Sequence, residues 1–244
     1  MTSDGRAVAV TGLVNARDLG GLPLVAGGVT PPGAFIRSER PDRVDTDGWS
    51  ALHRRGVRAV VDLRQPEERE AQPSLLPDTV ADLHVDHDGL ADHPDFWVGY
   101  WDTGLVGTPL YSLPHLEALP ERTLAVLSAI ATAPTGTVLF HCAGGRDRTG
   151  LIAAILLAVA GVEEDAIVAD YLETIANADA LAIGQGRPSG EPAVARLLGS
   201  LGTDSEQAFR SFLTGLDVDA LLDALPGDQA SAIRTWRGAL PVLP

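Results

Sequence analysis

The stretch TVLFHCAGGRDRTGLIAAILL, residues 137–157, decides the fold. Its first five residues, 137–141, are mostly apolar or β-branched and have the length of a short buried strand. A loop with two adjacent glycines follows. Residues 149–161 are then apolar on almost every side, which predicts a buried helix that ends at Gly161. A strand, a glycine-containing loop and a buried helix in this order are typical of an α/β protein with a parallel sheet.

The sequence on both sides of this stretch continues the alternation of strands and helices. Strands are predicted at 57–63 and 81–86, and helices at 46–56, 119–134 and 162–179. Residues 15–41 are dense in glycine and proline and predict short strands and tight turns. Four further helices are expected at about 190–200, 204–214, 217–225 and 228–238. We therefore expect one domain, 1–244, of the α/β class, with a mainly parallel central sheet, helices on both faces and a helical tail at about 190–240.

One long segment, residues 86–118, shows neither a helical nor a strand period. It is rich in aromatic side chains, among them Trp97, Trp101 and Tyr111, which either wall a substrate cleft or pack beneath the segment. Long irregular segments within a compact domain are usually functional. We expect this segment to be lid-like.

The composition narrows the function classes. The chain has 244 residues, 45% of them hydrophobic, and a formal net charge of −15, which argues against nonspecific binding to nucleic acid or to anionic membranes. No apolar stretch is long enough to span a membrane and no signal-peptide pattern is present, so no stable membrane insertion is expected. A single cysteine excludes an internal disulfide and, with no export signal, predicts a cytoplasmic protein. The composition does not indicate an oligomeric state.

The chemistry is concentrated in the loop between the strand and the buried helix. Cys142 stands at the carboxyl end of the strand, and the start of a helix offers unpaired N–H groups and positive partial charge to an anion. Gly144 and Gly145 allow the backbone to curl so that successive N–H groups face one point. Arg148, six residues after Cys142, can clamp two oxygens of a phosphoryl group, and these positive surroundings favour the thiolate form of the cysteine. The pattern predicts a thiolate nucleophile below a bound phosphate.

Simpler interpretations compete with this one. A lone cysteine is commonly a small buried hydrophobic residue, and two glycines between a strand and a helix are commonly only a turn. Their combination with an arginine and a hydroxyl residue at the helix start is much rarer, so we favour the catalytic interpretation. A nucleotide-binding loop of the Walker type requires lysine, and this chain has none. The histidines at 84, 87, 93 and 115 do not have the spacing of a metal site, so neither a metal nor another cofactor is expected.

The loop resembles the signature of the cysteine-dependent phosphatases, which is Cys, five residues, Arg, Thr. In its longer form, HCAGGRDRTG at 141–150, it is similar to the loop of bacterial tyrosine-protein phosphatases of the HC-x-x-GKDR type, a family related to the dual-specificity and phosphoinositide phosphatases. Three further stretches resemble the same family: NARDLGG at 15–21, FIRSERPDRVDTDGWSALHRRGVRAVVDLRQPEE at 35–68 and VADYLETIAN at 168–177. The resemblance implies a cysteine-phosphatase fold like that of the dual-specificity phosphatases. Arg146 departs from the family, because it stands where lysine is usual.

The resemblance also implies roles for the loop residues. Cys142 would be the nucleophile that forms a phosphocysteine intermediate, and Arg148 would clamp the phosphate. From its position on the strand, His141 is expected to orient the loop through a backbone hydrogen bond; an ion pair with Cys142 is the less favoured alternative, because neighbours on a strand point to opposite faces. Substrate binding would fall to Ala143, Gly144, Gly145, Arg146 and Thr149, the last of which would donate a hydrogen bond to the sulfur. Arg17, Asp18 and Arg37 either add to the phosphate pocket or form structural salt bridges.

The leaving oxygen needs a proton, and three aspartates are candidates for supplying it. Asp147 lies inside the loop, and the resemblance implies a catalytic role for it, so we rank it first. Asp62 ends a predicted strand that would open on the same crevice if it is parallel to the strand before Cys142, and it ranks second. Pairing with Arg64 is the other interpretation of Asp62. Asp102, in the lid-like segment, ranks third.

These observations predict a phosphatase that hydrolyses phosphomonoesters, with protein phosphotyrosine as the first expectation and a dual-specificity or phosphoinositide phosphatase as the alternative. The expected partners are phosphorylated proteins or phosphoinositides. A rhodanese-like sulfurtransferase also uses a loop cysteine, but its loop is usually one residue shorter and lacks the arginine–threonine ending. A module that binds phosphorylated ligands without turnover is a third class, and the intact Cys142, Asp147 and Arg148 argue against it.

Overall fold

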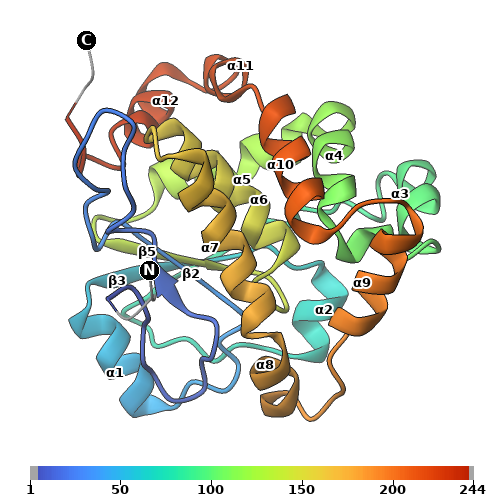
Figure 1. Ribbon diagram of the computed structural model, residues 1–244. Coiled ribbons are helices and arrows are strands. Elements are labelled where there is room, and N and C mark those ends of the chain that lie inside the picture. The colour runs from blue at the N-terminus through green and yellow to red at the C-terminus, as the bar shows by residue number, and fades with distance from the viewer. Residues whose placement is uncertain (1–4, 242–244) are drawn as a thin grey trace.

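A five-stranded sheet forms the centre of the molecule, and the computed structural model describes residues 5–241 (Figure 1). Its strands are β1 (Arg17–Asp18), β2 (Phe35–Ser38), β3 (Val57–Asp62), β4 (Ala81–His84) and β5 (Thr137–His141). Their spatial order is β1-β2-β5-β3-β4, and every neighbouring pair is parallel except β1 with β2. The expected α/β class with a mainly parallel sheet is confirmed.

The central strands end together at one edge of the sheet. In register, His141 of β5 lies beside Ser38 of β2 on one side and beside Asp62 of β3 on the other. Parallel strands bring their carboxyl ends to the same edge, which is where ligands bind in open α/β sheets. Cys142 follows β5 directly, so the loop predicted to be catalytic begins at this edge.

Helices cover both faces of the sheet, and the two faces differ in size. On one face, Trp49 and Leu52 of α1 (Thr46–Arg54) share a core cluster with Ile36 and Leu139. On the other face, the neighbouring strand residues Phe35 and Phe140 belong to the larger core. Successive side chains of a strand point to opposite faces, which divides the residues of each strand between the two cores. The larger core is covered by α5 (Pro120–Thr132), α6 (Asp147–Val159) and α7 (Glu164–Ala176).

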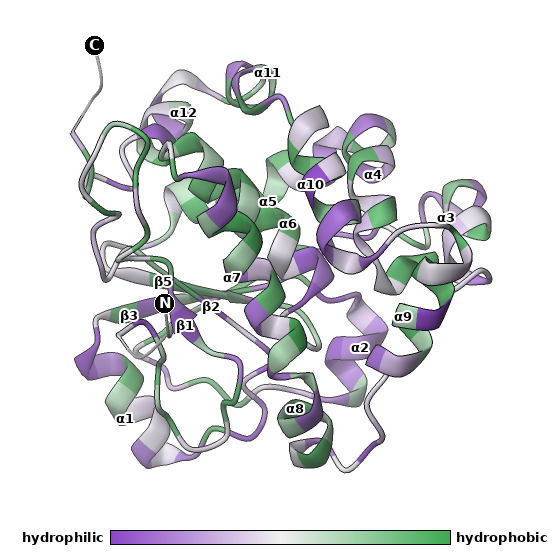
Figure 2. Cartoon of the chain, viewed as in Figure 1, coloured by the Kyte–Doolittle hydropathy of each residue, from purple (hydrophilic) through white to green (hydrophobic). Residues whose placement is uncertain are grey.

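Helix α6 is hydrophobic on nearly all sides, as Figure 2 shows along most of its length. Residues 149–157 are all buried, because α6 packs against the sheet, α5 and α7. The helix begins at Asp147, two residues earlier than expected, so Asp147 and Arg148 lie in its first turn. None of the helices within residues 5–241 has the length and hydrophobicity that a membrane span requires.

The four expected helices of the tail are present, and the last two are shorter than predicted. The tail consists of α9 (Glu191–Ser200), α10 (Ser205–Gly215), α11 (Val218–Asp223) and α12 (Gly227–Arg234). The predicted helix at 162–179 is instead α7 followed by α8 (Ala178–Gly184), with Asn177 between them. The tail returns to the body of the molecule through Trp236, which is fully buried and donates from Nε1 to the carbonyl oxygen of Leu156 (2.9 Å).

The expectation that residues 86–118 are irregular is wrong. The segment forms α3 (Pro94–Trp101), the 3-10 turns η1 (Leu105–Gly107) and η2 (Pro109–Tyr111), and α4 (Ser112–Ala118). These elements are too short to show a clear period in the sequence. They are organised by a buried aromatic cluster in which the rings of Trp97 and Tyr111 pack against His115.

Helix α2 (Pro66–Ala71) was not expected either. A proline at its first position and the capping interaction between Gln65 and Glu68 were signals for it. The Glu68 side chain accepts a hydrogen bond from the Gln65 backbone N–H (3.1 Å). This short helix matters for the site, because it carries Glu68 toward the loop after β5.

Candidate active site

The loop after β5 forms the floor of a cavity of about 270 Å³. Cys142 is only 4% exposed, and it lines this cavity together with Ala143, Gly144, Arg146, Asp147 and Arg148. Gly145, which has a φ of +70°, lies behind the cavity, where a Cβ would meet the backbone oxygen of Ser38 at 2.5 Å. The predicted nucleophile, clamp and first-ranked acid are therefore brought together in one cavity.

Arg148 is already engaged by two carboxylates. Its guanidinium donates to both oxygens of Glu68 (2.5 and 3.0 Å) and to Asp88 (2.9 Å). Burial opposes ionisation of Glu68, but the hydrogen bonds and charge of Arg148 outweigh burial and hold the pKa of Glu68 below its ordinary value. Two anchors fix the direction of the guanidinium fork beside the cysteine. A fork held in this way can clamp two oxygens of a phosphoryl group.

Asp147 is a carboxyl group whose pKa is raised. Burial raises the pKa of Asp147, although Arg146 and Arg148 oppose the shift. Its Oδ1 atom is buried and has no hydrogen-bond partner within residues 5–241, and the nearest cationic group is Arg146 Nε at 3.7 Å. A raised pKa in a cavity next to a nucleophile is what a general acid requires.

The structure does not bring Asp62 or Asp102 to the cavity. Asp62 is buried at the end of β3 and forms a two-point ion pair with Arg64 (2.9 and 2.7 Å). Burial raises the pKa of Asp62, but the hydrogen bonds of Arg64 and the charges of His141 and Arg64 outweigh burial, so the net shift is downward. Of the two interpretations of Asp62, pairing with Arg64 is the one seen. Asp102 is exposed at the end of α3 and does not line the cavity.

Asp88 is a cavity residue that the sequence analysis missed. It follows β4 at the same edge of the sheet, is buried, and accepts hydrogen bonds from Gln65 Nε2 (2.8 Å) and Arg148 Nη1 (2.9 Å). Burial raises the pKa of Asp88, while Arg148 and Gln65 lower it, and the net shift is upward. The rule that singled out Asp62 points to the carboxyl end of this strand as well, but Asp88 lies four residues beyond β4, so the signal for it was weak.

Arg146, at the position where the family usually has lysine, is held by the helical tail. Its Nη1 pairs with Glu191 at the start of α9 (2.5 Å), and its Nε lies 3.4 Å from the Tyr171 hydroxyl. Glu191 also lines the cavity, together with Ser189, Gly190 and Val194. No motif pointed to this contribution of the tail. The available signal was general: a largely buried arginine such as Arg146 needs a carboxylate partner.

The two remaining polar residues of the loop, His141 and Thr149, are both completely buried. The Nδ1 atom of His141 lies 2.9 Å from the carbonyl oxygen of Cys142, and burial lowers the pKa of His141, so the neutral ring donates to the backbone. Thr149 Oγ1 has no hydrogen-bond partner in the described part of the chain, so the expected bond to the sulfur is not formed there.

Aromatic and aliphatic side chains wall the cavity above the loop. Trp101, Val106 and Tyr111 come from residues 86–118, and Leu181 and Val194 come from α8 and α9. Trp97, the third aromatic residue considered as a wall, lies beneath the segment, where its Nε1 donates to the carbonyl oxygen of Asp88 (2.8 Å). The walls are therefore largely apolar, while the floor is charged.

Two histidines of the segment, His87 and His115, are buried packing residues. His87 and His115 lie ring to ring, with centroids 4.6 Å apart, and burial lowers the pKa of His115 to about 4. Burial, together with the charge of His115, also holds the pKa of His87 well below its ordinary value. Among residues 5–241, no group of three or more His, Cys, Asp or Glu side chains has the arrangement of a metal site.

The buried cysteine, the arginine fork and the helix start define a site of the cysteine-phosphatase class. A sequence profile of the tyrosine phosphatase family matches residues 8–219, and the chain belongs to that family. The resemblance drawn from the loop and its three companion stretches is thereby confirmed at the level of the family.

Individual proteins show the same relationship. The chain is 31% identical to a tyrosine-protein phosphatase of Nostoc commune in an alignment 157 residues long; the match covers 58% of this chain and 48% of that protein. It is 31% identical to the triple-specificity protein phosphatase PtpB of Mycobacterium tuberculosis in an alignment 170 residues long, and that match covers 59% of this chain and 61% of that protein. The chain thus spans between about half and three fifths of the length of these relatives. Among solved structures, a cysteine-to-serine variant of P. aeruginosa TpbA in complex with pTyr is 20% identical, with a TM-score of 0.46, 91% of this chain covered and 96% of that chain.

Proposed function

We propose that this protein is a cysteine-dependent protein-tyrosine phosphatase, a phosphoric monoester hydrolase that acts through a phosphocysteine intermediate. The observation that carries the proposal is the convergence of Cys142, the first turn of α6 and the Arg148 fork on one cavity. Membership in the tyrosine phosphatase family supports it. The proposed reaction uses only side chains and backbone groups of the loop, together with water, and therefore requires no cofactor.

The reaction has two steps. In the first, the Cys142 thiolate attacks phosphorus, the P–O bond to the substrate breaks, and Asp147 gives its proton to the leaving oxygen. Arg148 and the N–H groups at the start of α6 stabilise the charge on the three other phosphoryl oxygens. In the second step, water gives a proton to Asp147 and attacks phosphorus, the S–P bond breaks, and free phosphate and the thiolate are released.

The acid is Asp147 rather than Asp88, because the two carboxyl groups differ in their partners. Asp88 accepts hydrogen bonds from Arg148 and Gln65, and such bonds favour the ionised form. Asp147 Oδ1 has no charged donor within hydrogen-bond distance, since Arg146 Nε lies 3.7 Å away, and the Tyr171 hydroxyl lowers the pKa of Asp147 less than burial raises it. We therefore give Asp88 the task of holding Arg148 and leave Asp62 outside the chemistry.

Replacing Asp147 with Asn should make the rate depend on the leaving group. Turnover of an alkyl phosphate should fall by about 10²- to 10³-fold, and turnover of a nitrophenyl phosphate, whose leaving group needs little protonation, by about tenfold or less. Because the acid must be protonated, the wild-type rate on the alkyl substrate should fall as pH rises through the raised pKa of Asp147. This alkaline fall should disappear in the variant, as pH–rate profiles would show.

Asp88→Asn is the matched control for this experiment. If Asp88 only holds Arg148, Asp88→Asn should lower the turnover of both substrates by the same factor, because Asp88 then gives no proton to the leaving group. If Asp88→Asn lowered turnover of the alkyl phosphate more than Asp147→Asn did, Asp88 would be the general acid and Asp147 would not.

The cavity favours phosphotyrosine as the substrate. Its walls are apolar and aromatic, which suits a phenyl ring above the phosphate, and Arg146 is already paired with Glu191. A phosphoinositide with several phosphates would need further cations, for which Arg187 is the candidate in the cavity lining. The relative named for triple specificity makes dual-specificity or phosphoinositide activity the second candidate.

The test of the function is phosphate release from phosphotyrosine peptides in the presence of a metal chelator, with inhibition by vanadate. Phosphoserine peptides and phosphoinositides, compared by kcat/KM, separate the two candidates. Tight phosphopeptide binding without release would instead indicate a binding module, and thiocyanate formation from cyanide would indicate a sulfurtransferase.

A further inference from the structure

Every backbone carbonyl of the loop from Ala143 to Gly145 is held from behind, on the side away from the cavity. The oxygen of Ala143 accepts from the backbone N–H of Arg40 (3.2 Å), and that of Gly144 accepts from Asn15 Nδ2 (3.2 Å). The oxygen of Gly145 accepts from Arg37 Nη2 (2.8 Å). All three donors come from the first forty residues, far from the loop in sequence.

Holding these carbonyls determines where the loop N–H groups point. In a trans peptide the C=O of one residue and the N–H of the next point in opposite directions, and the described chain has no cis peptide bond. Carbonyls fixed behind the loop therefore turn the N–H groups of Gly144, Gly145 and Arg146 toward the cavity side. None of these three N–H groups has an acceptor within residues 5–241. The loop is thus set to receive an oxyanion before one arrives.

Arg37 is the charged member of this set of donors. It lies on β2, only 1% exposed, and bridges Gly145 to Asp170 of α7, whose carboxylate it contacts from Nη1 (2.5 Å). Burial and the charge of Arg17 lower the pKa of Arg37 to about 10, against the opposing charges of Asp170 and Cys142, so it remains a cation at neutral pH. Arg37 therefore also contributes positive charge beneath the nucleophile.

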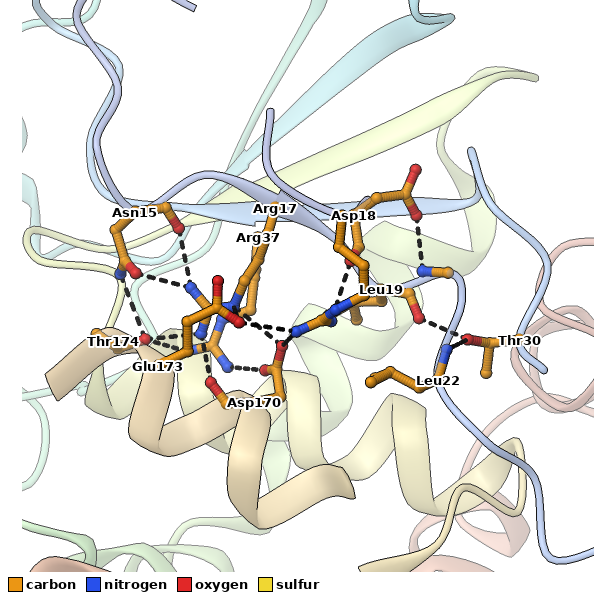
Figure 3. A network of polar contacts seen from close by, with 12 residues as sticks. Asn15, Arg17, Asp18, Leu19, Leu22, Thr30, Arg37, Asp170, Glu173 and Thr174 are labelled. Atoms are coloured by element: carbon orange, nitrogen blue, oxygen red, sulfur yellow. Dashed lines mark hydrogen bonds and ion pairs between the residues drawn. The ribbon is translucent and has the colours of Figure 1, made fainter. Parts of the chain in front are cut away.

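Asp170 is the centre of the surrounding network (Figure 3). It also binds Arg17, whose Nε lies 3.0 Å from Oδ1, and Arg6 at 2.9 Å. Burial opposes its ionisation, but these arginines hold the pKa of Asp170 far below its ordinary value. Arg17 makes no bond to a loop carbonyl; its other partners are Asn15, Thr174 and the Asp170 backbone. Arg17 and Arg37 thus share a carboxylate. Arg37 bonds a loop carbonyl directly, whereas Arg17 reaches the loop only through Asn15, whose Oδ1 accepts from Arg17 Nη1 (2.7 Å) and whose Nδ2 donates to Gly144.

We propose that Arg37, anchored by Asp170, is a positioning residue that presets the phosphate-binding loop by holding the carbonyl of Gly145 away from the cavity. The inference rests on the proposed phosphatase function for its kinetic consequence. Its structural consequence, the affinity of the loop for an oxyanion, is separate from turnover.

Asp18, by contrast, caps a turn, because its carboxylate accepts from the N–H groups of Gly20 and Gly33.

The test compares Arg37→Met with Arg17→Met. Both variants remove a buried arginine from the same carboxylate, so both should lower Tm. Arg37→Met should weaken vanadate binding by about tenfold or more and lower kcat/KM by about 10²-fold, whereas Arg17→Met, which acts on the loop only through Asn15, should have clearly smaller effects on both. Vanadate affinity is measured by calorimetry and kcat/KM with a nitrophenyl phosphate, both well below the Tm of each variant.

The lysine variants keep the test decisive if a methionine variant fails to fold. Lys in Arg37→Lys retains a charge for Asp170 but cannot span from Asp170 to Gly145 as the arginine fork does, and Arg17→Lys is its control. Equal losses of vanadate affinity in the Arg37 and Arg17 variants would overturn the inference, since a purely structural role predicts them. A wild-type protein that binds vanadate but releases no phosphate would refute the proposed function and leave this comparison intact.

Discussion

Cys142→Ser should abolish phosphate release, with a loss of at least about 10³-fold in kcat, while the protein keeps its fold and its affinity for phosphopeptides. The hydroxyl of serine is close in size to the thiol, but it is not ionised at neutral pH, so no thiolate is left to attack phosphorus. The phosphate-binding parts of the loop, Arg148 and the N–H groups, are untouched by the change. Turnover of nitrophenyl phosphate and calorimetric binding of a phosphotyrosine peptide give the two readouts.

The chain itself supplies a control for this experiment. Cys142 is its only cysteine, so alkylation of the wild-type protein can modify one thiol and should inactivate it in proportion to the incorporation of one group per chain. Vanadate, which would occupy the loop, should protect against that reaction. A serine variant that retains a tenth or more of wild-type turnover would show that Cys142 is not the nucleophile.

The fold was predictable where the local sequence pattern of an element agrees with its burial in the folded protein. Strand β5 and helix α6 have unambiguous patterns, apolar and β-branched residues followed by two glycines and an all-apolar helix, and the structure has both within two residues of the expected bounds. Residues 86–118 were misjudged because their helices are held by tertiary contacts of Trp97 and His115, and short helices gain little from their own propensity.

The site was predictable only in the loop itself. Cys142, Asp147 and Arg148 share one continuous motif, so their proximity follows from the sequence. Asp88 and Glu191 reach the same cavity, and Glu68 reaches Arg148, from three separate parts of the chain. Each of them balances an arginine of the loop, and a sequence shows that a buried arginine needs a counter-ion without showing which carboxylate supplies it.

The need of a buried arginine for a counter-ion also explains the roles of Arg17 and Arg37. A role for Arg17 and Arg37 in the phosphate pocket and a role in salt bridges appeared to be alternatives. The structure places both in buried ion pairs with Asp170, and neither lines the cavity. The stretches around Arg17, Arg37 and Asp170, which are far apart in the sequence, meet behind the loop.

Arg148→Lys should lower kcat/KM by about 10²- to 10³-fold and weaken vanadate inhibition in parallel, although the charge is conserved. Lysine offers a single nitrogen on a flexible stem, whereas the Arg148 fork makes two bonds to Glu68 and a third to Asp88 and can present two N–H groups to a phosphoryl group. Steady-state kinetics at several vanadate concentrations give both quantities.

Arg146→Lys makes the identical chemical change two residues earlier in the loop. Arg146 is bound to Glu191 at the side of the cavity and sits where the family usually has lysine, so this variant should keep kcat/KM within about threefold of wild type. The pair of variants separates the geometry of the fork from the positive charge of the loop. If both lysine variants lost activity equally, or if neither did, the bidentate clamp assigned to Arg148 would be wrong, and general electrostatic attraction would account for phosphate binding.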